Sequence, residues 1–339
     1  MDYVLGGPDV EAADAMARRA FAGLVMLLAL GTSGIAGAQG YPARPIRLII
    51  PFPPGGATDT MMRPIADKMG ERLGQPLVLE NRGGAGGTIG TDAGAKARPD
   101  GYTLLVGIIS PLAVNVELFG GKLPYDPLRD FAPISMITRI PVLLTVHPSM
   151  PARSMKEVIA LAKRSPGRLT YGSAGVGTTN NLTGELVNLE AGIRITHVPF
   201  KGAGPAVIAL IGGETDMLYA GPPGSLPHVR SGRLRAIAVT GAKRMATLPE
   251  VPTMMESGLP GVQVSGWYSL VAPAGTPREI IERLRTALIE AMAAPNVIAA
   301  LADQGAVLES STPAELRDFI EAEIGKWSRV IRAAGISVK

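Results

Sequence analysis

The sequence predicts an α/β fold with two lobes, each a parallel-type sheet flanked by helices, joined by two crossovers. Short apolar runs alternate with segments of helical periodicity, a pattern typical of a sheet covered by helices on both faces. The alternation begins near residue 45 and restarts after residue 140. With 339 residues, 46% hydrophobic and 18% charged, the chain can form two domains and bury a core in each.

The first alternating unit covers residues 41–140. Met61, Ile65, Met69 and Leu73 recur every four residues and therefore share one face of a helix. A strand–helix–strand–helix–strand order favours parallel strands, because parallel neighbours need a crossover connection. We expect strands at 46–51, 77–80 and 103–107, and helices at 60–73 and 88–97.

The second unit covers residues 142–262, and helical segments follow it. Ser154 with Glu157 three residues later is the pattern of a capping box at the start of a helix. We expect strands at 142–146, 169–173, 195–198, 216–220 and 234–239, and helices at 154–164, 178–189 and 204–211. A further strand near 262–271 and helices at 277–292 and 313–334, each with proline near its first turn, complete the chain.

Two segments are candidate crossovers between the lobes, one at 140–142 and one at 265–267. Two crossovers would return the chain to its first lobe and create a hinge. This organisation assigns 41–140 and 267–339 to lobe 1 and 141–266 to lobe 2. Trp267 and Tyr268 would then lie at the hinge, or simply pack in the core.

The amino terminus reads as an export signal. Arg18 and Arg19 precede an apolar stretch at 20–30, and Ala36-Gly37-Ala38 is a small-residue cleavage site. We expect residues 1–38 to be removed by cleavage after Ala38, which places the mature protein in the periplasm. The alternative is a membrane anchor, but the apolar stretch is short for ~30 Å of hydrocarbon. Because residues 1–15 are acidic, we take Met16 as the hypothetical true start.

Composition excludes several classes of function. The chain has no cysteine, which rules out disulfides, thiolate metal sites and cysteine nucleophiles. The formal charge of +4 favours anionic ligands in general. Nucleic acid is not expected as a partner, because the basic residues are scattered and aromatic residues make up only 4%.

Two glycine-rich loops, 51–60 and 172–181, each follow an apolar strand and open a helix. Glycine lets backbone N–H groups turn inward, and the following helix presents unpaired N–H donors and the positive end of its dipole. Ligands of α/β proteins bind beyond the carboxyl ends of the strands, where both loops lie. One loop per lobe predicts a site for a molecule with two polar ends; the alternative is two ordinary turns with helix caps.

A third glycine-rich loop, at 81–88, lacks the chemistry of a nucleotide site. Position 89 is isoleucine where a dinucleotide fingerprint requires glycine, and no phosphate P-loop motif occurs in the chain. We therefore interpret its glycines as serving close helix packing, and leave open whether Asn81 reaches a ligand.

Signals for catalysis are weak. Ser173 would need glycine at 171 for a nucleophile elbow, and that position is Tyr171. His147, His197 and His228 lie in separate units without the spacing of metal ligands. No cofactor, metal or catalytic residue is predicted, although an exported hydrolase whose catalytic residues meet only in space remains an alternative.

Several blocks in order make the chain resemble the Bug-type (TctC-like) extracytoplasmic receptors of tripartite tricarboxylate transporters. The resemblance runs from about residue 41 to 330. Its strongest blocks are YPARPIRLIIPFPPGGATD at 41–59, LENRGGAGGTIGTDAGAKARPDGYTLL at 79–105 and YGSAGVGTTNNLTGELVN at 171–188. It implies a two-lobe periplasmic-binding-protein fold (Venus flytrap, type II-like) without cofactor, acting as a monomer that delivers a carboxylate to membrane transporter subunits.

The resemblance also implies that both loops hold a ligand carboxylate, partly through backbone N–H groups and bridging waters. Asp59 and Asp216 could bind backbone donors or ligand, or form a general-acid pair, and Lys201 could face the cleft or only solvent. The candidate ligand-binding residues are Pro54, Gly55, Gly56, Ala57, Thr58, Asp59, Asn81, Ser110, Ser173, Gly175, Gly177, Thr178, Thr179, Asn181, Lys201 and Asp216.

One departure from the family pattern concerns Asn181, where these receptors usually carry histidine. An amide cannot become a cation, so a role that needs imidazolium is lost. Ligands of the family range from di- and tricarboxylates to amino acids and aromatic acids, and the sequence does not select among them. A receptor that signals to a sensor instead of a transporter is a further alternative.

Overall fold

A computed structural model describes residues 40–55, 57–302 and 304–337. The predicted signal peptide and its cleavage site, and the candidate residue Gly56, lie outside the described residues. The residues from Arg44 onward form one compact unit.

The first lobe is built on a six-stranded sheet in the order β11-β4-β10-β3-β1-β2. Its parallel centre consists of β1 (Ile46–Ile50), β2 (Leu77–Asn81) and β3 (Thr103–Ile108), as predicted. Strands β4 (Phe131–Pro141), β10 (Ser265–Pro273) and β11 (Val307–Leu308) join it in antiparallel pairs. The sheet is therefore mixed, and the sequence predicted neither β4 nor β11.

The second lobe is built on a five-stranded sheet in the order β7-β6-β8-β5-β9. Strands β6, β7 and β8 run parallel, whereas β5 pairs antiparallel with both β8 and β9. The strands are β5 (Leu143–Val146), β6 (Thr170–Ser173), β7 (Thr196–Pro199), β8 (Met217–Ala220) and β9 (Arg235–Val239).

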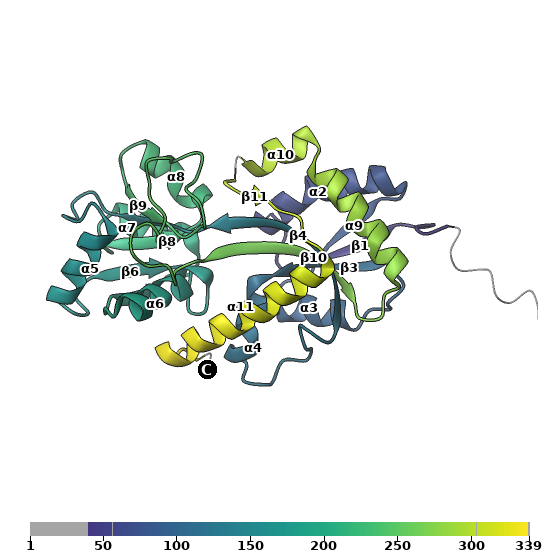
Figure 1. Cartoon of the computed structure of the whole chain (residues 1–339), viewed down its shortest axis with the longest axis horizontal. Coiled ribbons are helices and arrows are strands. Elements are labelled where there is room, and N and C mark those ends of the chain that lie inside the picture. Colours follow the sequence, from purple (N-terminus) through teal and green to yellow (C-terminus); the bar gives the residue numbers. More distant parts are fainter. Residues whose placement is uncertain (1–39, 56, 303, 338–339) are drawn as a thin grey trace, which may run out of the picture. The chain divides into compact units, whose positions relative to one another are not determined.

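Helices cover both sheets (Figure 1). Those predicted from periodicity begin and end within a few residues of the expected positions, and Ser154 caps α5 by accepting from the Glu157 N–H. The short helix α4 and the proline-containing α8 and α10 were not predicted. The helices are α2 (Ala57–Leu73), α3 (Thr88–Ala95), α4 (Asn115–Leu118), α5 (Met155–Arg164), α6 (Thr179–Ala191), α7 (Ala203–Ile211), α8 (Pro222–Arg230), α9 (Arg278–Met292), α10 (Pro295–Ala302) and α11 (Pro313–Ala334).

The two crossovers are the adjoining ends of β4 and β10, which run between the lobes as an antiparallel pair (Figure 1). Tyr268 is the first residue of β10 that pairs with β3, opposite Ile108. Before it in the chain, Ser265 and Gly266 pair only with β4, opposite Pro141 and Ile140. The ladder therefore narrows from three strands to two where it leaves the first lobe, which is where a hinge is expected.

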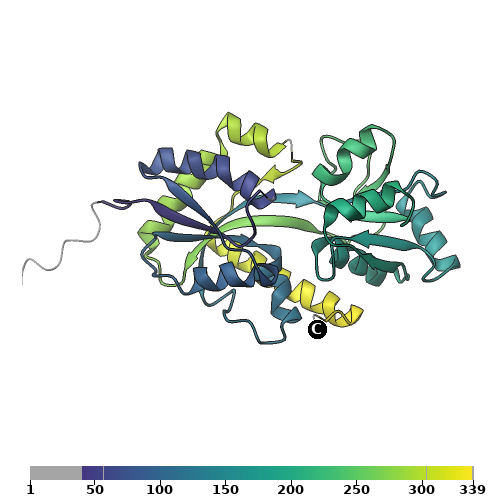
Figure 2. The ribbon, with the colours of Figure 1, turned by 180° about the vertical axis from the view of Figure 1, so that it is seen from behind.

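Helix α11 makes contacts in both lobes (Figures 1 and 2). Its Arg332 pairs with Glu117 of α4 at 2.9 Å, and its Arg329 pairs with Glu190 of α6 at 3.0 Å. Its buried Glu323 accepts hydrogen bonds from the indoles of Trp267 and Trp327, so Trp267 is a core residue.

Among the described residues, no single helix has the length and apolarity to cross a bilayer. Helices α9 and α10 satisfy the length and composition only when taken together, and they are bent by 71° at the break between them.

Candidate ligand-binding site

The first loop leaves the carboxyl end of β1 and enters α2. Gly55 has a φ of +77°, which L-residues rarely adopt, and its N–H donates to Asp59 Oδ2 at 3.1 Å. Asp59 is 5% exposed and forms an ion pair with Arg63 at 3.0 Å. The Arg63 hydrogen bond, followed by that from Gly55, holds the pKa of Asp59 below its usual value. The Asp59 carboxylate thus fixes the loop from inside.

Neighbouring elements hold this loop on two further sides. Asn81, at the end of β2, donates through Nδ2 to the carbonyl of Phe52 at 3.1 Å, so this side chain binds the loop. Thr58 is buried and its side chain lies beside Tyr268 of the crossover strand β10. Burial raises the pKa of Tyr268, and the Thr58 contact partly offsets that effect. Pro54 is exposed at the turn.

The third glycine-rich loop packs directly against the first. A Cβ at Gly83 would lie 2.9 Å from Pro53 Cδ, and one at Gly87 would lie 3.3 Å from the Phe52 ring. Asn115 holds the loop from the other side by donating to Gly86 O and to Thr88 Oγ1, each at 3.2 Å. The sequence gave no signal for Asn115, because its partners lie 27 and 29 residues away.

The second loop leaves the carboxyl end of β6 and enters α6. Gly177 has a φ of +75°, and its N–H donates to Asn181 Oδ1 at 3.0 Å. Thr178 caps α6 by accepting from the Asn181 N–H, and donates to the Gly175 carbonyl at 2.7 Å. Thr179 begins the helix. Asn181 is 2% exposed, so its side chain faces the protein interior and not the open side of the loop.

Ser173 is fully buried at the end of β6. Its Oγ accepts from the Gly175 N–H at 3.0 Å and lies 2.6 Å from His197 Nε2. The ring of His197 stacks on Tyr171 with centroids 5.0 Å apart, and burial lowers its pKa. A buried serine between a loop amide and a neutral imidazole positions the loop and offers no exposed nucleophile.

A polar chain runs behind the second loop. Asn181 Nδ2 donates to Tyr171 Oη at 2.9 Å, and Tyr171 Oη lies 2.6 Å from Glu185 Oε1. Tyr171 is fully buried, whereas Glu185 is half-buried on α6. Sequence reasoning missed both residues. The signal was present in retrospect, because Asn181 and Glu185 are one helical turn apart on a single face.

The second loop also touches the first lobe. A Cβ on Gly177 would lie 2.8 Å from Leu118 Cδ1, so this leucine of α4 rests on the loop. Asn115 on the same short helix holds the third loop. Helix α4 therefore joins glycine-rich loops of both lobes, a contact that the sequence did not predict.

The last three candidates occupy different places. Lys201 is exposed in a turn that runs beside the second loop, where Phe200 N–H donates to Ser173 O and Gly202 N–H to Ala174 O. Ser110 is half-buried and follows β3 at the start of a π-helical turn.

Asp216 does not join the second loop. Its Oδ2 accepts from Thr170 N–H at 2.7 Å and from Thr170 Oγ1 at 2.9 Å. Thr170 begins β6 and Ser173 ends it, so Asp216 lies at the amino ends of the parallel strands, opposite the loop edge. Its carboxylate accepts from donors of the sheet. The expected strand at 216–220 already placed Asp216 at an amino end, away from the carboxyl ends where ligands bind.

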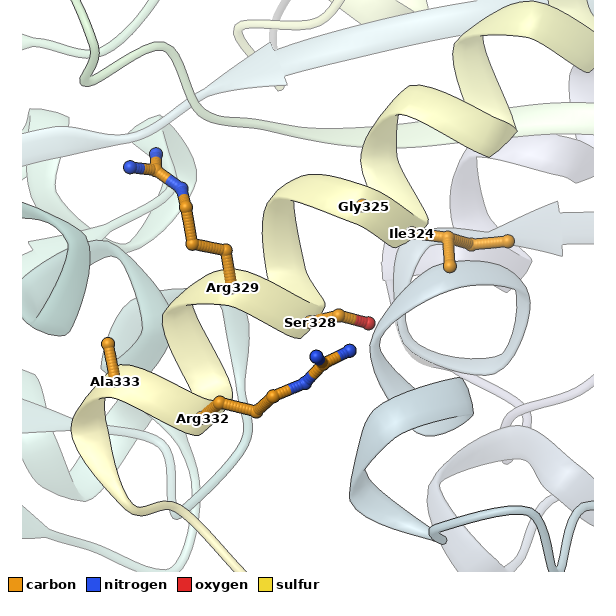
Figure 3. Close-up of a pocket in the computed structure, with 6 residues that line it drawn as sticks. All are labelled: Ile324, Gly325, Ser328, Arg329, Arg332 and Ala333. Carbon is orange, nitrogen blue, oxygen red and sulfur yellow. The ribbon is translucent and has the colours of Figure 1, made fainter.

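A groove of about 690 Å³ lies along α11 (Figure 3). Its lining includes Ser328, Arg329 and Arg332. Both arginines are already paired with glutamates of α6 and α4, so this groove presents no unpaired cation from among these side chains.

The chain is similar to known proteins along most of its length. A family model described as the tripartite tricarboxylate transporter family receptor matches residues 61–336. The BugT protein of Bordetella pertussis is 43% identical over 314 residues, which is 91% of this chain and 96% of BugT.

Two solved structures from relatives hold small acids. The Rpa4515 protein of R. palustris with adipate has a TM-score of 0.75 and 36% identity, covering 88% of this chain and 100% of its own. MatC of Rhodopseudomonas palustris with bound malate has a TM-score of 0.71 and 36% identity, covering 86% and 100%.

The periplasmic binding protein BugD has a TM-score of 0.72 and 32% identity, covering 88% of this chain and 100% of its own. These neighbours confirm the predicted fold class, and the family consists of solute-binding receptors, not enzymes. Because the family model covers most of the chain and BugT matches nearly end to end, this chain belongs to the periplasmic receptors of the tripartite tricarboxylate transporter family.

Proposed function

We propose that the chain binds a small carboxylate between its first and second glycine-rich loops and presents it to a transporter of the tripartite tricarboxylate type. The observation that carries this proposal is the common construction of the two loops. Each leaves the carboxyl end of a parallel strand, turns at a glycine with φ near +75° and opens a helix of 13 or 17 residues. The Leu118–Gly177 contact joins the second loop to the first lobe.

The chemistry of these loops suits an anion. Backbone N–H groups at the start of a helix lie at the positive end of its dipole, and they hold a carboxylate without a side-chain cation. Side chains behind each loop take up one glycine N–H, from Gly55 and from Gly177. This leaves the loop shape fixed before the ligand arrives, which lowers the entropic cost of binding.

Dicarboxylates are the first ligands to test, because two relatives with 36% identity were solved with adipate and malate. One carboxylate per loop would match two helix N-termini that come from different lobes. Closure of the lobes would then follow from the ligand's preference for the closed state. Delivery to a transporter rests on the description of the family.

The experiment is a thermal-shift screen of the protein from Gln39 onward, followed by calorimetric titration. The panel contains adipate, malate, citrate, monocarboxylates and acidic amino acids, with adipamide as the uncharged control. A ligand at 100 times its dissociation constant adds about 2.7 kcal/mol to the free energy of unfolding. A rise with an acid and none with adipamide supports the proposal. No rise with any acid, for protein that native mass spectrometry shows to be empty, contradicts it.

A test of the site uses Thr58→Ala and Lys201→Ala beside Asp216→Asn. The first two residues lie at or beside the glycine-rich loops, whereas Asp216 lies at the opposite end of the second-lobe sheet. We expect weaker acid binding in the loop variants and unchanged binding in Asp216→Asn, even though that variant loses stability. The reverse pattern would move the site away from the loops.

A further inference from the structure

The second loop is held by a directional chain of hydrogen bonds. Gly177 N–H donates to Asn181 Oδ1 at 3.0 Å, Asn181 Nδ2 donates to Tyr171 Oη at 2.9 Å, and Tyr171 Oη lies 2.6 Å from Glu185 Oε1. Tyr171 and Asn181 are buried, and the chain ends on the half-buried Glu185.

The carboxylate sets the direction of every bond. An ionised Glu185 can only accept, so it takes the single proton of Tyr171. The tyrosine oxygen is then an acceptor, and only the NH₂ end of Asn181 can face it. The amide oxygen must consequently face the Gly177 N–H. Tyr171 Oη also lies 3.2 Å from the carbonyl of Asn181, but the shorter contact to a charged acceptor is the stronger one.

Two observations indicate that polarity, and not packing alone, carries the effect. Burial, followed by the charge of Glu185, raises the pKa of Tyr171, so the hydroxyl keeps the proton that it donates. A Cβ at Gly184 would lie 2.4 Å from the Tyr171 ring, which shows that the ring is wedged against α6 and has little room to swing. A change at Glu185 therefore alters the hydrogen-bond pattern before it alters the packing.

The second loop has little room for another conformation at Gly177. Gly177 has a φ of +75° and is buried beneath Leu118 of the first lobe. Rotation of its peptide would turn the N–H outward and shift both the loop backbone and the contact between lobes. In the first loop the Gly55 N–H is held by Asp59, whose carboxylate can only accept and is oriented by Arg63.

We propose that Glu185 is a positioning residue for ligand binding, acting through Tyr171 and Asn181 to fix the direction of the Gly177 N–H and the shape of the second loop. The inference rests on the proposed role of this loop in carboxylate binding. Glu185 itself contacts no ligand and influences affinity only through the chain.

Asn181→Asp tests the direction of the chain, because the two side chains have the same shape. A protonated carboxyl can accept from Gly177 and donate to Tyr171, as the amide does. An ionised carboxylate cannot donate, and the one Tyr171 proton cannot serve both Asp and Glu185. Titratable groups around this position are Tyr171 on β6, Glu185 on α6, His197 on β7 and Tyr219 on β8. Burial and the negative Glu185 should raise the pKa of the introduced carboxyl.

Adipate is the probe, and the readout is the ratio of variant to wild-type dissociation constants at each pH, which cancels the titration of adipate itself. We expect a ratio near one at pH 4.5 that rises to roughly tenfold by pH 7.5, the factor for one lost hydrogen bond. Glu185→Leu removes the acceptor and should weaken binding at pH 7.5, because the Tyr171 proton is then free to turn toward Asn181. Asp216→Asn, a carboxyl-to-amide change at the other end of β6, should give a flat ratio near one.

A readout without ligand separates this inference from the proposed function. Hydrogen exchange of the Gly177 amide, measured by NMR, should be faster in Glu185→Leu and Tyr171→Phe than in wild type and unchanged in Asp216→Asn. Unchanged exchange with a flat ratio in Asn181→Asp would overturn the positioning role. Faster Gly177 exchange in a protein whose wild type binds no acid would support the hold on the loop and contradict the carboxylate function.

Discussion

Asp59 and Asn181 occupy equivalent positions in the two lobes. Each is the third residue of its helix and accepts a hydrogen bond from the N–H of a glycine four positions earlier. The distances are 3.1 Å from Gly55 and 3.0 Å from Gly177, and the two glycines have φ of +77° and +75°. The two lobes thus repeat one loop design with different side-chain chemistry. The anionic version is neutralised by Arg63, whereas the neutral version donates onward to Tyr171.

Asp59→Asn should remove an acid-dependent part of the stability. The pKa of Asp59 is lowered mainly by the Arg63 hydrogen bond and then by Gly55. Its contribution is therefore present above the unfolded-state pKa of about 3.9 and is lost as pH falls through the lower folded-state pKa. Urea unfolding at pH 7, 4 and 3 should show a shallower acid loss in the variant. Equal acid slopes in the two proteins would contradict this role.

His197→Gln should flatten the stability profile on the acid side of neutrality. Burial lowers the pKa of His197, so the unfolded chain takes up the proton first, near pH 6.5. The free energy of unfolding of the wild type should therefore fall as pH drops below about 6.5 and level off below the folded-state pKa. The glutamine variant keeps a polar partner for Ser173 without titrating. A variant whose unfolding free energy falls as steeply between pH 7.5 and 5 would refute the assignment.

Gly184→Ala should destabilise the protein despite the better helix propensity of alanine. Its Cβ would lie 2.4 Å from Tyr171 ring atoms, and overpacking of this kind costs about 1–3 kcal/mol. Gly325→Ala on α11 is the matched control, because a Cβ there meets nothing within 4 Å. We expect that control to gain roughly 0.5–1 kcal/mol in chemical unfolding. A gain in both variants would show that the Tyr171 ring yields easily.

Gly177→Ala should lose both stability and acid binding. The change combines a left-handed backbone, which costs about 1–2 kcal/mol for alanine, with a 2.8 Å approach to Leu118. Gly192→Ala isolates the first cost, because Gly192 has a φ of +59° with nothing within 4 Å of its Cβ. Adding Leu118→Ala to Gly177→Ala removes the steric contact but not the backbone strain. The free energy of unfolding that is recovered should equal only the difference between the costs of Gly177→Ala and Gly192→Ala. Full recovery would show that backbone strain at Gly177 is negligible.

Local sequence was sufficient for the parallel strands and the long helices, but not for β4. This strand contains Ser135 and Thr138, both fully buried, which hide its apolar character. Their hydroxyl groups are satisfied by Ser311 and Val307, about 170 residues further along the chain. A pattern read within one segment cannot show that such polar residues will find partners in another.

The candidate site divides in the same way. The sequence by itself determined where the strands and helices lie, because their apolar residues recur with the period of each element. It also determined where the chain turns, because glycine is favoured where φ is positive. Only the tertiary structure decided which way the side chains of these loops point. Asn181 faces inward because Tyr171 and Glu185 lie behind it. Asp216 accepts from Thr170, a partner 46 residues away that its place at the start of a strand did not reveal. These outcomes depend on strand register and on contacts between distant segments, which a linear pattern does not contain.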